Sequence, residues 1–81
     1  MDDSGEFLFA PNLHIANRAA LKQGWHAYGR SGWIKPDGNQ VHFISVAEQL
    51  AAIGKHATVY FVGELSPKVR RFDFKWAKLR A

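Results

Sequence analysis

Residues 33–44 decide the fold that this sequence predicts, and they read Trp33-Ile34-Lys35-Pro36-Asp37-Gly38-Asn39-Gln40-Val41-His42-Phe43-Ile44. Proline presets its own φ, an aspartate side chain bonds the nearby backbone, and glycine accepts a positive φ. The four residues 36–39 therefore predict a tight turn. We expect the segments on either side of it, 33–35 and 41–44, to form a β-hairpin.

The segment after the hairpin predicts a helix and then a strand. Ser45-Val46-Ala47-Glu48 matches the S-x-x-E capping box, in which the two outer side chains satisfy orphan backbone amides reciprocally. Apolar residues then follow the i, i+4, i+7 spacing of one helical face as far as Ile53, and Gly54 ends the pattern. Residues 58–62 are β-branched and aromatic throughout, which is typical of a largely buried strand.

Before the hairpin, the sequence predicts a strand followed by a helix. The apolar run Glu6-Phe7-Leu8-Phe9-Ala10 stops at Pro11, and its short length favours a strand. We expect Asn17 to cap a helix that runs to Tyr28. Leu21, Trp25 and Tyr28 would then share one helical face. Residues 1–5 are expected to form a frayed end.

Residues 67–80 support two interpretations. As a strand, this segment places Phe72, Phe74 and Trp76 on one face, because alternate residues of a strand share a face. As a helix, it begins well, because Ser66 can cap it and Pro67 suits the first helical position. The helix leaves Phe74 outside the apolar stripe, so the three alternating aromatic residues favour the strand.

The predicted order is β-α-β-β-α-β with a final strand or helix, which indicates the α+β class. That order is the split βαβ arrangement of ferredoxin-like folds. Right-handed crossovers would place both helices on one face of an antiparallel or mixed sheet of four or five strands. The chain is too short for two cores, so we expect residues 1–81 to form a single small domain.

Composition narrows the class of protein. The 81 residues are 47% hydrophobic and 22% charged, as in an ordinary globular protein. There is no cysteine, so neither a disulfide nor a thiolate metal site is possible. No apolar run approaches the roughly 20 residues of a membrane span, and the acidic start is wrong for a secretory signal. We therefore expect a cytoplasmic protein without a membrane partner.

The residue types that carry chemistry in enzymes are scattered along the chain. No two of the four histidines have the spacing of a metal site, and three of the seven carboxylates fall in the first six residues. The serines lie in no nucleophile motif, and no phosphate-binding loop is present. The sequence therefore predicts a protein that is not an enzyme and that needs no metal or other cofactor.

One short motif resembles part of a known family. Leu8-Phe9-Ala10-Pro11-Asn12-Leu13 resembles the first RNA-contact motif of RNA-recognition motif domains, which share the β-α-β-β-α-β order and stack bases on sheet aromatics. The second motif of that family should fall on the third strand. Residues 38–44 lack its basic-Gly-aromatic-Gly-aromatic pattern. We therefore carry no function over from that family.

The basic residues concentrate near the C-terminal end. Six of the eleven Lys and Arg residues lie in 67–81, where Asp73 is the one acid. Cations attract phosphates whatever the base sequence, and flat aromatic side chains offer faces on which bases stack. The pattern predicts a small non-catalytic module that binds nucleic acid, either DNA or RNA. The candidate binding residues are Lys68, Arg70, Arg71, Phe74, Lys75, Trp76, Lys78 and Arg80.

The alternative is a small protein-interaction module, such as an accessory or inhibitor protein of the phage or plasmid type. In that interpretation an apolar face binds the partner protein, and the charges only keep the chain in solution. The positions of Phe74 and Trp76 discriminate between the two interpretations. If these rings are buried and the basic residues are scattered, nucleic-acid binding loses its main support. The pattern favours neither a monomer nor an oligomer.

Overall fold

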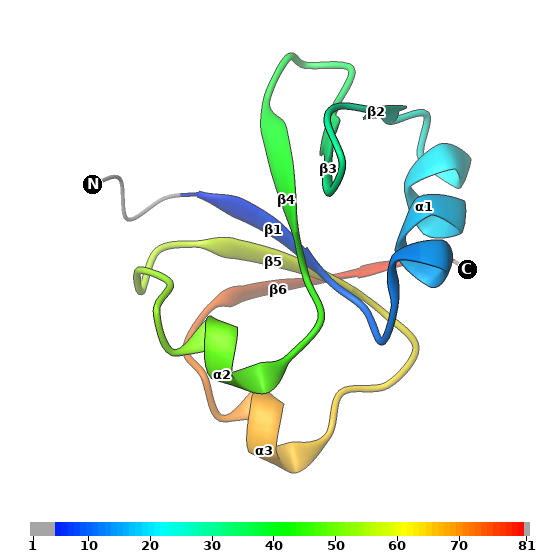
Figure 1. Ribbon diagram of the computed structural model, residues 1–81. Helices are drawn as coiled ribbons and strands as arrows, with labels where there is room; N and C mark the ends of the chain where they lie inside the picture. The colour runs from blue at the N-terminus through cyan, green and yellow to red at the C-terminus, as the bar shows by residue number, and fades with distance from the viewer. Residues whose placement is uncertain (1–4, 81) are drawn as a thin grey trace.

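The strands assemble into one mixed sheet of six strands in the computed structural model, which describes residues 5–80 (Figure 1). The sheet order is β2-β3-β4-β1-β5-β6, and three helices accompany it within these residues. The elements are β1 (Glu6–Phe9), α1 (Leu13–Lys22), β2 (His26–Ala27), β3 (Gly32–Ile34), β4 (Gln40–Ile44), α2 (Ala47–Leu50), β5 (Thr58–Val62), α3 (Pro67–Arg70) and β6 (Lys75–Leu79).

The predicted hairpin is confirmed as β3 and β4, which pair in antiparallel register around the turn at 36–39. Lys35 N–H donates to Asn39 O and Gly38 N–H donates to Lys35 O, each at 2.9 Å. The Asp37 side chain accepts from Asn39 N–H, and Gly38 has a φ of +92°. The turn therefore uses the properties that predicted it. The strands expected at 6–10 and 58–62 are also present, as β1 and β5.

The first helix begins and ends earlier than the sequence predicted. Asn12, not Asn17, caps it, because the Asn12 side chain accepts from Ile15 N–H at 2.9 Å. At the other end, Gly24 takes a φ of +81° while its N–H donates to Leu21 O and Trp25 N–H donates to Ala20 O. These two bonds form a Schellman motif, which stops the helix before Trp25.

The early stop changes which face of the first helix is buried. The predicted face fails because Leu21 and Tyr28 are 68% and 56% exposed. The buried residues of α1 are three alanines, Ala16, Ala19 and Ala20. Their small side chains let the helix backbone lie close to the sheet.

The predicted capping box at 45–48 does not form. Helix α2 is a single turn whose N-cap is Val46, and it has no side-chain cap bond. Ser45 contributes its backbone N–H instead, which donates to the Gln49 side-chain carbonyl at 3.4 Å. Residues 51–53 continue only as turns, in which each N–H bonds to the carbonyl three residues before it.

The N-terminal ends of α1 and α2 lead to two contrasting predictions. Asn12→Ala should lower the free energy of unfolding by about 1 kcal/mol, because it leaves an α1 amide without its acceptor. For a domain of this size, that loss corresponds to a drop of about 4–8 °C in the melting temperature. Ser45→Ala should leave the melting temperature close to the wild-type value. Thermal unfolding followed by circular dichroism measures both, and a wild-type melting temperature for Asn12→Ala would show that Asn12 is not the cap.

The helices cover both faces of the sheet, which corrects the prediction of two helices on one face. Alternating β1 residues separate the faces: Leu8 packs against α1, whereas Phe7 and Phe9 pack against α2 and α3. The crossover from β1 to β4 runs one way along the sheet, and those from β4 to β5 and from β5 to β6 run the opposite way. Right-handed crossovers in opposite directions place their helices on opposite faces.

The α+β class and the mixed alternative for the sheet are confirmed, but the predicted number of strands is not. The sheet has six strands instead of four or five, and β1 is parallel to both β4 and β5. The ferredoxin-like arrangement is not confirmed. The expected frayed end at 1–5 falls outside the described residues except for Gly5, whose carbonyl accepts from Thr58 N–H at 3.0 Å.

Candidate nucleic-acid interface

The C-terminal segment contains both of the structures that the sequence offered as alternatives. Pro67 begins the single turn of α3, where its missing N–H costs nothing. Phe72 N–H closes that turn on Val69 O, and the chain then leaves the helical path. At Lys75 it joins the sheet as β6, which pairs in parallel with β5. The favoured strand is therefore correct only for residues 75–79, and the helix only for 67–70.

The three aromatic side chains of this segment are partly buried and pack on one another. Phe72 and Phe74 stack with an interplanar angle of 7° and centroids 5.6 Å apart, so one face of Phe74 is covered. Trp76 meets Phe74 and Phe61 only in tilted, edge-type contacts, at 5.5 and 6.1 Å. The Trp76 indole N–H donates to Phe72 O at 3.0 Å, which fixes the ring. Trp76 is therefore the better stacking candidate of the two predicted.

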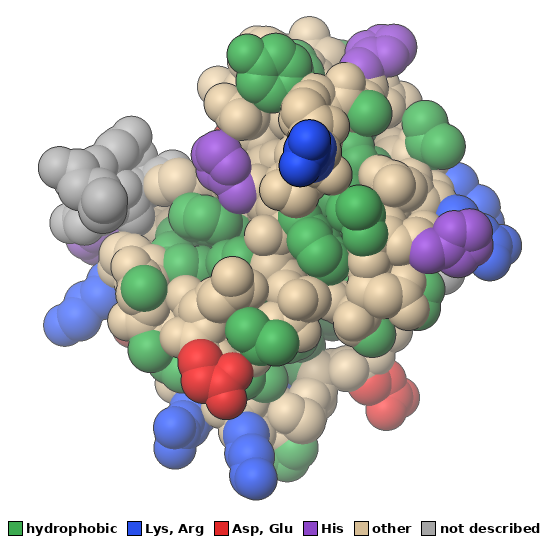
Figure 2. Space-filling view, viewed as in Figure 1, with side chains coloured by type: hydrophobic (Ala, Val, Ile, Leu, Met, Phe, Trp, Pro, Cys, Tyr) green, Lys and Arg blue, Asp and Glu red, His purple; other side chains and the backbone are tan. Residues whose placement is uncertain are grey.

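The predicted basic residues are all exposed, but the structure divides them between surfaces. Because β6 side chains alternate, Lys78 shares the Trp76 face of the sheet and Lys75 lies on the other. Arg71 lies over the Phe72 ring, 5.7 Å from its centroid. In the view of Figure 2, blue Lys and Arg side chains project from the lower end of the molecule, where Figure 1 places α3.

One open groove brings part of the predicted set together. It has a volume of about 570 Å³ and lies between the β5–α3 connection and β6. Arg70, Trp76 and Lys78 are the predicted residues that line it. The other lining residues are Phe61, Gly63, Glu64 and Leu65. The remaining predicted residues, Lys68, Arg71, Phe74, Lys75 and Arg80, do not line this groove.

The residues that the sequence did not single out come from the neighbouring strand. Phe61 and Lys78 are register partners across β5 and β6. Glu64 and Leu65 follow β5 after the single residue Gly63. No local pattern in the sequence predicts that these residues belong to the site, because only the parallel pairing of β5 with β6 brings them there. The one sequence signal that bears on them is the strand predicted at 58–62, which includes Phe61.

Arg71 and Phe74 line a different hollow on the same side of the molecule. It has a volume of about 400 Å³, and Lys55 and Asp73 also contribute to its lining. An acidic side chain thus stands beside the two cations. The groove at Trp76 has the same charge balance, because Glu64 stands there beside Arg70 and Lys78. The groove differs in being the larger of the two and in having an aromatic ring with no stacked neighbour among residues 5–80, whereas Phe74 is stacked on Phe72.

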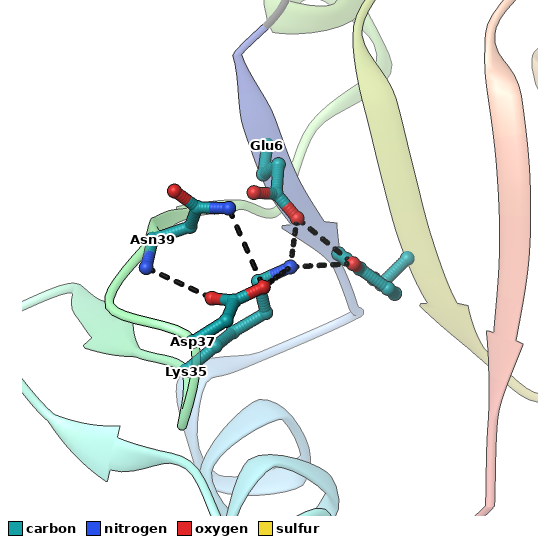
Figure 3. A network of polar contacts seen from close by, with 5 residues as sticks. Glu6, Lys35, Asp37 and Asn39 are labelled. Atoms are coloured by element: carbon teal, nitrogen blue, oxygen red, sulfur yellow. Dashed lines mark hydrogen bonds and ion pairs between the residues drawn. The ribbon is translucent and has the colours of Figure 1, made fainter.

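A second polar cluster lies on the α1 face of the sheet, where Glu6, Lys35 and Tyr60 meet beside the hairpin turn (Figure 3). The Tyr60 hydroxyl donates to Glu6 Oε1 at 2.8 Å, and Lys35 Nζ lies 2.5 Å from that oxygen and 3.1 Å from the hydroxyl. The Asp37 carboxylate is 3.3 Å from Lys35 Nζ. The cluster joins β1, β5 and the hairpin turn.

The protonation preferences of this cluster favour a structural role. Burial alone would lower the pKa of Lys35, but its bonds to Glu6, Tyr60 and Asp37 raise the pKa above its usual range. Burial raises the pKa of Tyr60. Lys35 therefore stays charged and Tyr60 stays neutral at neutral pH. Neither side chain is poised to exchange a proton there.

No three His, Asp or Glu side chains gather to hold a metal ion among residues 5–80. In the same part of the chain, no helix has the length and apolar character needed to cross a membrane. Comparisons of the chain with protein-family models, with curated proteins and with solved structures find no match. A function must therefore be inferred from the geometry of the surface.

Proposed function

We propose that this protein is a small non-catalytic nucleic-acid-binding module whose binding surface is the groove between α3 and β6. The observation that carries this proposal is the meeting of Arg70, Trp76 and Lys78 along one open groove. Two exposed cations there share the groove with a partly exposed aromatic ring. Cations that hold phosphates and a ring that accepts a base are the two components of single-strand and non-specific binding sites.

The surroundings of the groove strengthen its attraction for phosphate. Residues 67–80 carry six basic side chains against one acidic side chain, a local charge of +5. Charges outside the groove act over roughly 10 Å at about 0.1 M salt, so they add to the field even without touching the ligand. The groove also lies toward the carboxyl ends of the parallel strands β5 and β6. Open sheets with parallel strands commonly bind ligands at such ends.

The test is a double variant, Arg70→Gln with Lys78→Gln, which removes both groove cations and keeps hydrogen-bonding side chains of similar length. On duplex DNA, the slope of log affinity against log salt should decrease by up to about 1.8, because each lost phosphate contact is worth about 0.9. Fluorescence anisotropy titrations with labelled oligonucleotides at several salt concentrations measure that slope. Circular dichroism checks that the variant is folded.

The matched control is Arg18→Gln with Arg30→Gln. Both residues are exposed, and neither lines the groove. This variant has the same net charge as the groove variant, so it should keep the wild-type slope within a few tenths. An equal loss of slope in both variants would indicate a diffuse field with no binding groove. Absence of any wild-type binding at about 50 mM salt, where phosphate attraction is strong, would rule out the proposed function.

Protein binding is the second candidate function, and one observation favours it. A hollow of about 700 Å³ opens beside β1 and β4, and its lining includes the apolar side chains of Phe7, Ile44 and Ile53. The aromatic packing around Phe74 points the same way, because a ring covered by Phe72 offers less surface to a base. If no oligonucleotide binds, this interpretation becomes the leading one.

A further inference from the structure

The lining of the groove is chemically divided. Its sheet side presents Trp76 and Phe61, which lie on one face because Val59 is the register partner of Trp76 and side chains alternate along each strand. Gly63 ends β5 with a φ of +80°, and Glu64 and Leu65 follow it to form the other wall. Arg70 comes from α3. The groove thus combines aromatic surface, two cations and one carboxylate.

This arrangement suits an unpaired base better than a duplex. Bases within a duplex are stacked on their neighbours and present only their edges in the grooves. An aromatic surface that lies inside a groove can reach a base face only when the base is unstacked. Helix α3 has four residues, too few to read a major groove as a recognition helix does. A volume of about 570 Å³ lies in the range of pockets that hold small ligands.

The carboxylate of Glu64, which lines the groove, would discriminate among bound groups by their charge and hydrogen-bonding character. A carboxylate repels phosphate, so the phosphates should lie at Arg70 and Lys78 and the base should lie nearer Glu64. A carboxylate also accepts hydrogen bonds from exocyclic amino groups, as in contacts to the N4 amino group of cytosine. Thymine and uracil have a carbonyl at that position, which the carboxylate repels.

We infer that the groove seats one unpaired base of a single-stranded nucleic acid, with the base against Trp76 and its amino group at Glu64. This inference rests on the proposed function, and it adds the strandedness of the ligand and the class of base. Cytosine and adenine carry such an amino group. Arg70 and Lys78 hold the phosphates on either side of the seated nucleotide.

The experiment compares labelled homopolymers of dC and dT of equal length, together with rC and a mixed-sequence duplex, in anisotropy titrations. Cytosine and thymine have similar stacking surface, so their affinity ratio isolates the amino group. We expect dC to bind about tenfold more tightly than dT, the value of one hydrogen bond to a charged group. We expect the duplex to bind more weakly than dC. The dC and rC titrations distinguish DNA from RNA as the source of the strand.

Variants at Glu64 and Trp76 test where the base binds. Glu64→Gln introduces an amide that can accept a hydrogen bond from the cytosine amino group or donate one to the thymine carbonyl. The variant should therefore have no preference between the two bases, so the dC to dT ratio should fall toward one. Trp76→Ala should weaken single-strand binding by about tenfold, the value of one base stacked on an aromatic ring. Trp76→Phe keeps an aromatic ring in the core contacts. It should retain more of the affinity than Trp76→Ala, and it provides the comparison if the alanine variant is poorly folded.

Each outcome separates this inference from the function on which it rests. Equal dC and dT affinities in the wild type, or an unchanged ratio in Glu64→Gln, would overturn the base seat. Duplex affinity equal to or greater than that of dC would overturn the preference for single strands. If one of these contrary results appears while the Arg70→Gln/Lys78→Gln variant still weakens duplex binding, the proposed function stands and this inference fails. If no oligonucleotide binds, both fail.

Discussion

Trp33→Ala should lower the free energy of unfolding by about 3–5 kcal/mol, the usual cost of truncating a buried tryptophan. Trp33 lies on β3 with 1% of its surface exposed. It meets Phe43 edge to face, and its indole N–H donates to the Asn17 side chain of α1 at 2.9 Å. Truncation removes the contact between hairpin and helix and leaves the Asn17 oxygen without its donor. A domain this small has little stability in reserve, so much of the population should unfold.

Urea denaturation followed by circular dichroism measures this loss, with Trp33→Phe as the control. The phenylalanine variant keeps most of the buried apolar surface and loses the hydrogen bond, so it should lose about 1–2 kcal/mol. An alanine variant with a wild-type midpoint would show that the hairpin does not pack on α1 through Trp33.

Glu6→Ala should lower the free energy of unfolding by about 3 kcal/mol, because it leaves the mostly buried Lys35 ammonium with the largely exposed Asp37 carboxylate, 3.3 Å away, as its remaining counter-charge. The side chains of Lys35 and Glu6 expose only 14% and 15% of their surface. Removing the carboxylate also takes away the acceptor of the Tyr60 hydroxyl. Most of the loss should come from the poorer compensation of the Lys35 charge, and urea denaturation of the variant measures it.

The double variant Glu6→Leu with Lys35→Met tests that cause, since it removes both charges and keeps apolar volume. It should be close to the wild type in stability, because replacing a buried ion pair by apolar residues is often neutral. A double variant as unstable as Glu6→Ala would show that the pair itself, and not the compensation of the Lys35 charge, supplies the stability.

The same network sets the pH range of stability. The pKa of Lys35 and that of Tyr60 are both raised in the folded protein. Their contribution should therefore be fully present below about pH 10, near the unfolded values, and should be lost as the pH rises through the folded values. The pKa of Asp37 is lowered, chiefly by the hydrogen bond from Asn39 N–H. Its contribution should be lost only at acid pH, below about 4.

The sequence predicted correctly the element whose conformation is set by the preferences of its own residues. The hairpin follows from Pro36, Asp37 and Gly38, whose conformational preferences act within the turn itself. The sequence prediction placed the start of the first helix at Asn17, but Asn12, five residues earlier, has the same side-chain chemistry and is the residue that caps it. With Asn12 as the cap, Asn17 lies within the helix, where its side chain accepts from the Trp33 indole. The capping box at Ser45 does not form because α2 begins one residue later than the box requires, with Val46 at its N-cap.

The candidate site could be predicted in composition but not in arrangement. The sequence identified Arg70, Trp76 and Lys78 by their types, but also five other residues that do not line the groove. Separating them requires the register of β6 on β5, which fixes that Lys78 shares a face with Trp76 and lies beside Phe61. It also brings Glu64 into the groove. Register is a long-range property that residue spacing does not encode.

β6 is an edge strand of the sheet, and this position gives its basic side chains a second role. Within residues 5–80 only β5 pairs with β6, so the outer backbone groups of that strand have no strand partner. Such strands recruit other chains unless charged side chains keep them apart, and Lys75, Lys78 and Arg80 are exposed there. Polyanions that neutralise these side chains would remove this protection. Under the proposed function, saturation with nucleic acid should therefore promote self-association, and light scattering should rise near charge neutrality and fall again when added salt releases the nucleic acid.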